Sequence, residues 1–290
     1  MMVSSETGEH QKELKTSPCS ILFVPGSRLD RIQKALNSGA DAVIVDLEDA
    51  VAETDKVAAR TGVDRFLADN PQVRVLIRIN AAGTEHFVPD LEMCSRQPGV
   101  AGIMLPKAED VHALAKVADC GKPVWPLVET AKGVLEIPQL IRCPGVVRMS
   151  FGALDLCAEL GLKPQSEGAV KVLDHCRCEL VLNSCSTGLE PPVESVYPDI
   201  NNAEAVEQAA RHARQMGLTG MLCIHPRQLE PVHRAFEPDA EDVEWARRVI
   251  AKVTGNEAAF TLDDQMIDAP VVARARKILA AFENHSRSRS

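Results

Sequence analysis

Three charged side chains stand at the ends of short apolar runs, where a strand would deliver them to one surface. Glu129 follows the run VWPLV, Asp155 follows VVRMSFGAL, and Arg78 lies inside VLIRI. Two carboxylates held close together repel each other, so they require a cation between them or a raised pKa. A hard divalent ion that keeps several waters, such as Mg²⁺, suits oxygen ligands of this kind. The competing interpretation is that Glu129 and Asp155 stabilise the N-termini of the helices that follow.

Arg78 brings a planar cation to the same surface. A guanidinium pairs through two parallel hydrogen bonds with a carboxylate or with an enolate-like pair of oxygens. The alternative role is an internal ion pair with one of the acidic residues of the neighbouring run, which are Asp46, Glu48 and Asp49. The two roles are compatible with each other.

Two other residues at run ends are expected to have structural roles. We interpret Lys107 as a loop lysine or an ion-pair partner rather than a Schiff-base lysine, because no neighbour in the sequence would desolvate it. His225, directly before Pro226, is expected to be a hydrogen-bonded turn residue. The GxSxG and HExxH motifs of serine hydrolases and zinc proteases are absent from the sequence.

The elements that must position these residues are eight apolar runs rich in Val and Ile. They are ILFVPG from 21, AVIVDLED from 42, VRVLIRIN from 73, GIMLPK from 102, VWPLVET from 124, VVRMSFGALD from 146, PPVESVY from 191 and GMLCIHP from 220. Short, nearly continuous apolar runs are typical of parallel strands covered on both faces, and amphipathic stretches separate them here. The pattern predicts an α/β protein with a (β/α)8 TIM barrel, in which the reacting groups sit at the C-terminal strand ends. A doubly wound open sheet is disfavoured, because no GxGxxG turn follows an early run.

The chain is expected to divide into four segments. We predict a disordered leader over 1–19, the barrel over 20–235, a C-terminal helical extension over 236–283 and a disordered tail over 284–290. The extension contains two helical stretches, EDVEWARRVIAKV and PVVARARKILAAF, joined by an acidic loop.

Composition narrows the classes of partner. The 290 residues include 32 Lys and Arg against 41 Asp and Glu, which gives a formal net charge of −9. Nucleic-acid binding requires a basic surface, so this balance argues against it. No run approaches the ~18 consecutive apolar residues that a membrane helix needs. We therefore expect a soluble protein without nucleic-acid or membrane partners.

Nine cysteines are present, and their spacing does not resemble a disulfide framework. Cys176, Cys178 and Cys185 cluster near His175, which raises the possibility of a zinc site, but the spacing matches none of the usual ones. Free thiols that pack as small hydrophobic groups are the favoured interpretation. Free thiols are typical of the reducing cytoplasm, which is the expected location.

The motifs at the run ends, taken in order, resemble the citrate lyase beta-subunit-like family. The matching segments are LFVPGSRLDRI, VIVDLEDAV, IRIN, IMLPKAED, VETAKGV, FGALDLCAELG, ESVYPDINN and IHPRQL. The resemblance extends from about residue 20 to residue 282, through QMIDAPVVARA. This family belongs to the HpcH/HpaI aldolase and citrate lyase group, which also includes malyl-CoA and citramalyl-CoA lyases.

The resemblance implies a Mg²⁺-dependent C–C lyase. Such an enzyme cleaves a β-hydroxy acyl-CoA of citramalyl-CoA or malyl-CoA type to acetyl-CoA and a 2-oxo acid. By resemblance, Glu129 and Asp155 bind the metal and Glu129 also contacts the substrate, while Arg78 grips its carboxylate. Asp268 matches a late aspartate that a neighbouring subunit supplies as an acid–base group, which implies a homotrimer or a dimer of trimers. The alternative role of Asp268 is to cap the helix that follows it.

The resemblance assigns further residues to the substrate. Phe23 and Lys34 become candidate contacts in the thioester pocket, and the acidic residues Asp46, Glu48 and Asp49 form a shell around Arg78 and the metal waters. Glu194, where the family often has Asp, is another substrate-binding candidate. Lys132 is a second departure from the family pattern, and both departures bear on acyl specificity more than on the reaction type.

Other functions compete with this one. A citrate lyase beta subunit would act on a citryl thioester of an acyl-carrier protein, beside alpha and gamma partners. A non-catalytic thioester-binding barrel would be expected to lack some of Glu129, Asp155 and Arg78, yet all three are present. A simple aldolase would turn over free 2-oxo acids without any thioester. Malyl, citramalyl and citryl groups differ only at one carbon, so pocket shape decides among them.

Overall fold

The computed structural model describes residues 17–253, 259–263 and 265–288. Most of the predicted leader lies outside the described residues. The chain separates into two compact units, one ending at Ala235 and the other starting at Phe236.

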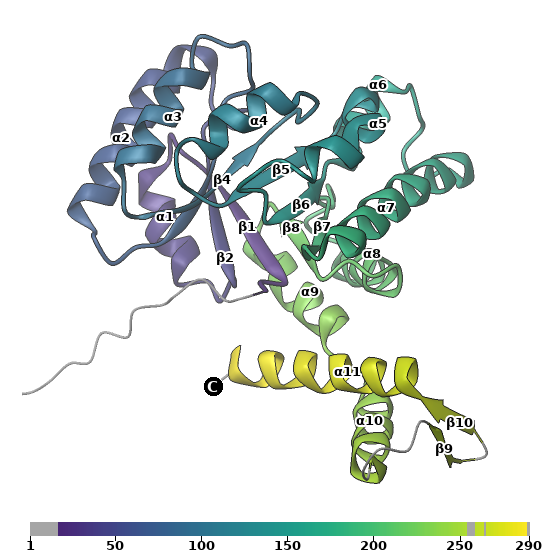
Figure 1. Ribbon diagram of the computed structural model, residues 1–290. Helices are drawn as coiled ribbons and strands as arrows, with labels where there is room; N and C mark the ends of the chain where they lie inside the picture. Colours follow the sequence, from purple (N-terminus) through teal and green to yellow (C-terminus); the bar gives the residue numbers. More distant parts are fainter. Residues whose placement is uncertain (1–16, 254–258, 264, 289–290) are drawn as a thin grey trace, which may run out of the picture. The chain divides into compact units, whose positions relative to one another are not determined.

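The first unit is a closed barrel of eight parallel strands in sequential order (Figure 1), which confirms the predicted (β/α)8 fold. The strands are β1 (Ser20–Pro25), β2 (Ala42–Asp46), β3 (Val75–Arg78), β4 (Val100–Leu105), β5 (Val124–Val128), β6 (Arg148–Phe151), β7 (Glu190–Glu194) and β8 (Gly220–Cys223). Each strand overlaps one of the eight apolar runs. Closure comes from parallel pairing of β1 with β8, in which Ser20 is opposite Met221.

Helices follow the strands along the chain and surround the barrel (Figure 1). They are α1 (Leu29–Leu36), α2 (Lys56–Asp69), α3 (Phe87–Arg96), α4 (Val111–Ala118), α5 (Ala131–Leu140), α6 (Ala153–Glu159), α7 (Glu167–Thr187), α8 (Ala203–Gln215) and α9 (Leu229–Phe236), with the 3-10 helices η1 (Glu53–Asp55) and η2 (Pro226–Gln228). Side-chain caps begin several of them. Thr130 accepts from the N–H of Gly133, and Ser166 accepts from that of Ala169.

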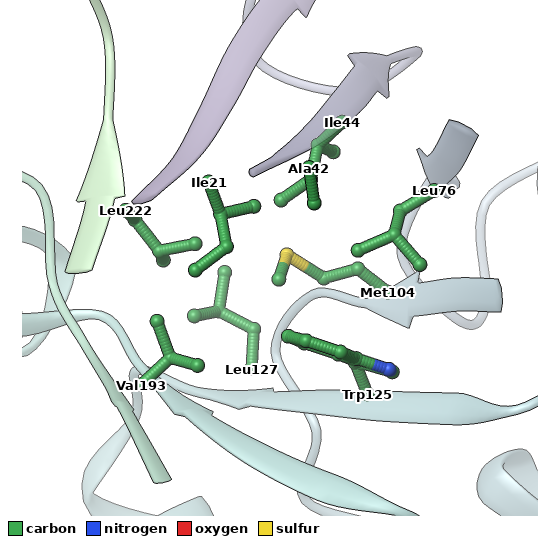
Figure 2. Packing of buried hydrophobic residues seen from close by; sticks show 9 residues of the cluster. All are labelled: Ile21, Ala42, Ile44, Leu76, Met104, Trp125, Leu127, Val193 and Leu222. Carbon is green, nitrogen blue, oxygen red and sulfur yellow. The ribbon is translucent and has the colours of Figure 1, made fainter. Parts of the chain in front are cut away.

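Inward-facing side chains fill the barrel, as Figure 2 shows. The buried cluster consists of Ile21, Ala42, Ile44, Leu76, Met104, Trp125, Leu127, Val193 and Leu222. Because side chains alternate along a strand, these residues fix which later positions also face the barrel axis.

A buried arginine lies at the N-terminal ends of the strands. The Arg148 guanidinium donates to the carbonyls of Pro191 and Pro18 and to the Thr219 hydroxyl, at 2.7, 2.9 and 2.8 Å. It also stacks over the Trp125 ring at 5.4 Å. Burial lowers the pKa of Arg148 to about 10, so the side chain keeps its charge at neutral pH. Arg148 therefore ties the segment before β1 to the starts of later strands.

The second unit contains α10 (Ala240–Lys252), an antiparallel pair β9 (Ala259–Leu262) and β10 (Gln265–Asp268), and α11 (Ala269–Ser288). The two helical stretches agree with the predicted extension, but the segment between them was expected to be a loop and instead forms a hairpin. Apolar side chains of the hairpin and both helices make a separate small core, which includes Ala246, Val249, Leu262, Ile267 and Ala275. Helix α11 continues to Ser288, past residue 283, where the disordered tail was expected to begin. Among the described residues, no helix is both long and apolar enough to cross a lipid bilayer.

Candidate active site

Four strands place a side chain at the barrel mouth two residues after one that fills the barrel. The pairs are Ile21 and Phe23, Ile44 and Asp46, Leu76 and Arg78, and Leu127 and Glu129. The two-residue period of a strand points both members of a pair toward the barrel axis. The C-terminal ends of β1, β2, β3 and β5 therefore direct an aromatic ring, two carboxylates and a guanidinium to one place.

Arg78 is held in a fixed orientation by this arrangement. Its Nε and Nη2 donate to the two carboxylate oxygens of Asp46 at 2.7 and 2.6 Å, and its guanidinium lies 4.8 Å from the Phe23 ring centroid. Burial would lower the pKa of Arg78, but the hydrogen bonds to Asp46 and the nearby acidic charges raise it above the usual value. The backbone N–H groups of Glu48 and Ala50 complete the hydrogen bonding of Asp46. The predicted ion pair between Arg78 and an acidic residue of the preceding run is present in the structure, with Asp46 at the end of β2 as the partner.

Glu48 connects Arg78 to Lys107. Its Oε1 accepts from Lys107 Nζ at 2.5 Å, and its Oε2 lies 3.3 Å from Arg78 Nη1. Among the described residues, Oε2 of Glu48 accepts no hydrogen bond although it is buried. Burial raises the pKa of Glu48, and Arg78 and Lys107 oppose that effect. Asp49 is more distant, with its carboxylate 3.9 Å from Arg78 Nη1.

Lys107 stands between the two halves of the site. Burial would lower the pKa of Lys107, but the hydrogen bond to Glu48 raises it, so the amine is protonated rather than nucleophilic. Its backbone N–H donates to Glu129 Oε1 at 2.8 Å, with the residue in a left-handed conformation at φ 48°. The interpretation of Lys107 as an ion-pair partner agrees with these contacts, but its backbone contact with Glu129 was not anticipated.

Glu129 is almost completely buried, with 1% of the residue exposed. Burial raises the pKa of Glu129 to about 8, and repulsion from Glu48 and Asp155 adds to this, while the Lys107 N–H opposes it. Asp155 lies in the first turn of α6 and is exposed to solvent. A buried carboxylate next to other carboxylates is a site that a cation would stabilise, and one or two carboxylates with waters are a usual set of Mg²⁺ ligands. The residues present therefore fit a Mg²⁺ ion.

Gly152 makes room for Glu129. A Cβ on Gly152 would lie 2.5 Å from Glu129 Cβ and 2.8 Å from Glu129 Oε2, which is closer than side chains approach. Gly152→Ala is therefore expected to displace the Glu129 carboxylate and to lower the free energy of unfolding by ~1–3 kcal/mol, the usual cost of overpacking. Urea denaturation and Mg²⁺ titration measure the two effects.

The matched control for Gly152→Ala is Gly168→Ala in α7, where an added Cβ meets no atom within 4 Å. Alanine is the better helix former, so this variant should gain up to ~1 kcal/mol and keep its Mg²⁺ affinity. Equal Mg²⁺ affinity in the two variants would contradict the positioning role of Gly152.

The raised pKa of Glu129 predicts that Mg²⁺ binding depends on pH. An ion that binds the carboxylate must displace its proton, so affinity should rise by about tenfold per pH unit up to about pH 8 and then level off. The free energy of unfolding of the Mg²⁺-free protein should instead decrease as the pH rises. Since folded Glu129 holds a proton that an unfolded glutamate loses above its ordinary pKa of 4.5, stability falls as pH rises from about 4.5 to 8.

Calorimetric titration with Mg²⁺ between about pH 6 and pH 9 measures this dependence. Glu129→Gln provides the control, because its binding should be weaker and nearly independent of pH. A wild-type affinity that does not change over this range would show that Glu129 does not bind the ion.

A buried network of hydrogen bonds around Lys56 and Asn80 holds the loop between β2 and α2 in place. Lys56 Nζ donates to the carbonyls of Leu47 and Glu48 and to Asn80 Oδ1, and all of these groups are buried. Asn80 in turn donates to Asp90 through its backbone and its side chain. Nothing in the sequence indicates this network, since Lys56 lies inside a helical stretch and its partners are 8 to 24 residues away.

The structure does not bring Glu194 and Lys34 together with these residues. Glu194 lies next to the inward-facing Val193 and so points away from the barrel axis, where Arg177 of α7 grips its carboxylate at 2.6 and 3.0 Å. Lys34 is on α1, largely exposed, 3.9 Å from Asp30. Phe23, by contrast, is at the mouth beside Arg78.

Asp268 belongs to the second unit. It is the last residue of β10, paired with Ala259, and its Oδ1 accepts from the Val271 N–H at 3.2 Å. It therefore caps α11, and its position in a strand corrects the expectation of a loop. Capping through one oxygen leaves the other oxygen of the carboxylate available for a second role.

The remaining sequence features have structural explanations. His225 caps η2, accepting from the Arg227 N–H, as expected of a turn residue. All nine cysteines are free thiols. Cys176 is buried in α7, whereas Cys178 and Cys185 are exposed on the same helix. Within the part of the chain that the structure describes, these three thiols are not among the groups whose ligand atoms lie close enough together to share a metal ion.

The chain matches a family model, and it is similar to other proteins in sequence and in structure. Residues 19–226 match the family model HpcH/HpaI aldolase/citrate lyase. A citrate lyase subunit beta-like protein of Mycobacterium tuberculosis is 37% identical over 263 residues, covering 89% of this chain and 93% of its own. A (3S)-malyl-CoA thioesterase of Cereibacter sphaeroides is 31% identical, covering 91% and 94%. The crystal structure of CitE from Mycobacterium tuberculosis with magnesium, acetoacetate and coenzyme A is similar at a TM-score of 0.81 and 34% identity, covering 92% of this chain and 99% of that one.

Proposed function

The chain belongs to the HpcH/HpaI aldolase/citrate lyase family, and from this premise we propose that it is a Mg²⁺-dependent carbon–carbon lyase. Its proposed substrate is a β-hydroxy acyl-CoA of the citramalyl-CoA or malyl-CoA type, and its products are acetyl-CoA and a 2-oxo acid. The observation that carries the proposal is the buried Glu129 carboxylate, which lies near Asp155 and is joined to Arg78 through Lys107 and Glu48.

Arg78 is proposed to bind the oxygens of the substrate. Nε and Nη2 of its guanidinium donate to Asp46, and Nη1 lies 3.3 Å from Glu48, so the N–H groups of Nη1 and the second N–H of Nη2 are the donors proposed to meet the substrate. Two donors on a fixed plane suit a carboxylate or the enolate oxygen of a thioester. Because Asp46 and Phe23 already hold the guanidinium, little further ordering is needed when the substrate binds.

Glu129 and Asp155 are proposed to bind Mg²⁺, and the similar CitE structure also contains magnesium. Mg²⁺, when bound, polarises the keto oxygen of the 2-oxo acid. Lys107 keeps the Glu129 carboxylate in place through its backbone N–H and cancels the charge of Glu48 with its amine. Phe23 is proposed to line the thioester pocket, and Lys34, whose amine is exposed, to meet coenzyme A at its edge.

Asp268 is proposed to act as the acid–base group of a neighbouring protomer, in a homotrimer or a dimer of trimers. This role would explain why the Asp268 carboxylate is half-buried while only its Oδ1 accepts the capping hydrogen bond from the Val271 N–H. This proposal requires that a single protomer be inactive.

A second candidate function is hydrolysis of the thioester, because one relative is a (3S)-malyl-CoA thioesterase. The same polarising ion and the same arginine would serve either reaction, and the two differ in which bond breaks. A lyase breaks the C–C bond and leaves the thioester intact in acetyl-CoA. A thioesterase instead releases free coenzyme A and a hydroxy acid.

The experiment is to incubate the full chain with malyl-CoA, citramalyl-CoA and citryl-CoA, with Mg²⁺ or with excess chelator. Acetyl-CoA, the 2-oxo acid and free thiol are each measured in protein-free filtrates, because the protein carries nine thiols of its own. A lyase forms acetyl-CoA and 2-oxo acid in equal amounts without free thiol. Free thiol together with malate, citramalate or citrate would establish the thioesterase, and full turnover in chelator would overturn the role of Mg²⁺.

A further inference from the structure

A second group of possible metal ligands lies at the N-terminal ends of the strands, at the opposite end of β1 and β2 from the mouth. Cys19 directly precedes β1, Asp41 directly precedes β2, and His233 belongs to α9. Their ligand atoms, one sulfur, one carboxylate oxygen and one imidazole nitrogen, all lie within 4.8 Å of one another. None of the three takes part in the site at the mouth.

The backbone holds this cluster in place. Asp41 Oδ2 accepts from the N–H groups of Cys19 and Ser20 at 3.0 and 3.2 Å, so the start of β1 orients the carboxylate. Ser20 Oγ accepts from the Asp41 N–H at 3.0 Å and lies 2.7 Å from His233 Nε2. Since Ser20 is paired with Met221 in the closed sheet, all three ligand residues are positioned by the rigid part of the barrel.

The separations suit an ion between the three groups. Cys19 Sγ is 3.1 Å and His233 Nε2 is 3.8 Å from Asp41 Oδ2. Ligand atoms that share a tetrahedral Zn²⁺ lie about 3–4 Å apart, because each is ~2.0–2.3 Å from the metal. Small side-chain rotations would therefore bring the three atoms to one centre without moving the backbone.

The chemistry of the donors selects the metal. A thiolate, an imidazole and a carboxylate form a mixed S, N, O set, which favours Zn²⁺ over the Mg²⁺ expected at the mouth. Without a metal, a thiolate 3.1 Å from the Asp41 carboxylate would be repelled by it, so the thiol keeps its proton and donates a hydrogen bond to Asp41 Oδ2. A divalent ion removes that repulsion and releases the thiol proton as it binds.

We propose that Cys19, Asp41 and His233 bind a Zn²⁺ ion, with a fourth position left for water. The ion connects the segment before β1, the residue before β2 and α9, which are far apart in the sequence. Its effect is to stabilise the closed barrel, and its place is at the end of the strands that carries no catalytic group.

Co²⁺ is the probe, since it replaces Zn²⁺ and reports its ligands by absorption. The full chain is titrated with Co²⁺ in excess Mg²⁺, which occupies the oxygen-ligand site at the mouth. We expect one equivalent to give intense visible bands of tetrahedral Co²⁺ and a near-ultraviolet thiolate-to-cobalt band, both abolished by added Zn²⁺. Zn²⁺ should also raise the melting temperature of the metal-free protein.

Three variants test whether Cys19 and His233 are the ligands of the bound ion. Cys19→Ser should lose the thiolate band, and His233→Gln should weaken Zn²⁺ binding by more than about 100-fold, since even outer partners of a metal ligand contribute 10–100-fold. Cys178→Ser, which removes an exposed thiol of α7, is the control and should leave the spectrum unchanged. The proposal is overturned if the wild-type spectrum equals that of Cys19→Ser, or if Cys178→Ser removes the band.

Discussion

Glu129→Gln is expected to lower lyase turnover by about three orders of magnitude while leaving the protein folded. A metal that polarises a carbonyl contributes several kcal/mol, and each ~1.4 kcal/mol is a factor of ten in rate. The amide has the shape of the carboxylate and still accepts from the Lys107 N–H, so the local geometry is retained. Initial rates at saturating substrate over a range of Mg²⁺ concentrations measure the loss.

The free energy of unfolding of Glu129→Gln shows whether its loss of turnover comes from a changed active site or from unfolding. In Mg²⁺-free buffer above about pH 8 the variant should be more stable than the wild type, because it no longer buries a charged carboxylate near Glu48 and Asp155. Glu167→Gln, at an exposed position of α7, is the control and should match the wild type in rate. A Glu129→Gln enzyme with near-normal turnover would rule out this residue as a metal ligand.

Asp268→Asn is the second variant with a large expected effect, a fall of roughly 10²–10⁴ in turnover with the fold intact. Asparagine caps a helix about as well as aspartate, so the bond to the Val271 N–H and the stability of α11 should be preserved. Turnover and thermal unfolding, measured on the same sample, separate the acid–base role from the capping role. Asp263→Asn, in the turn of the same hairpin, is the control and should keep full activity.

Mixing experiments test whether Asp268 acts on a neighbouring protomer. Protomers with Asp268→Asn and protomers with Glu129→Gln are each inactive, and they are dissociated and reassembled together. A mixed oligomer contains some sites with both residues intact, so part of the activity should return. No recovery in verified mixed oligomers would mean that Asp268 serves its own protomer or does no chemistry.

The barrel and the centre of its mouth could be predicted because both depend on short-range regularities. Apolar runs identified every strand of the barrel, and the two-residue period places Ile44 and Leu76 inside and then Asp46 and Arg78 at the mouth. The ion pair of Arg78 with an acidic residue of the preceding run follows from the adjacency of β2 and β3. These features need no knowledge of distant parts of the chain.

The features that were missed depend on contacts over long sequence separations or on unusual backbone. Lys107 holds Glu129 through its backbone N–H because its φ is positive, which is unusual for a lysine. Glu194 looked like a mouth residue because it ends a strand, but the phase set by Val193 turns it toward Arg177, 17 residues earlier. The β9–β10 hairpin was not predicted because its two strands are only four residues long and lie in an acidic segment.

The way the barrel closes affects how the protein is made on the ribosome. Ser20 is paired with Met221 and Pro18 accepts from Arg148, so β1 gains its second neighbour only after about 200 more residues have been synthesised. At ~5–20 residues per second, β1 waits roughly 10–40 seconds with one unpaired edge. Because unpaired strand edges recruit other chains, we expect nascent chains to be most prone to aggregation in this interval. Slower translation of the last strands would lower the yield of folded protein without changing any residue of the site.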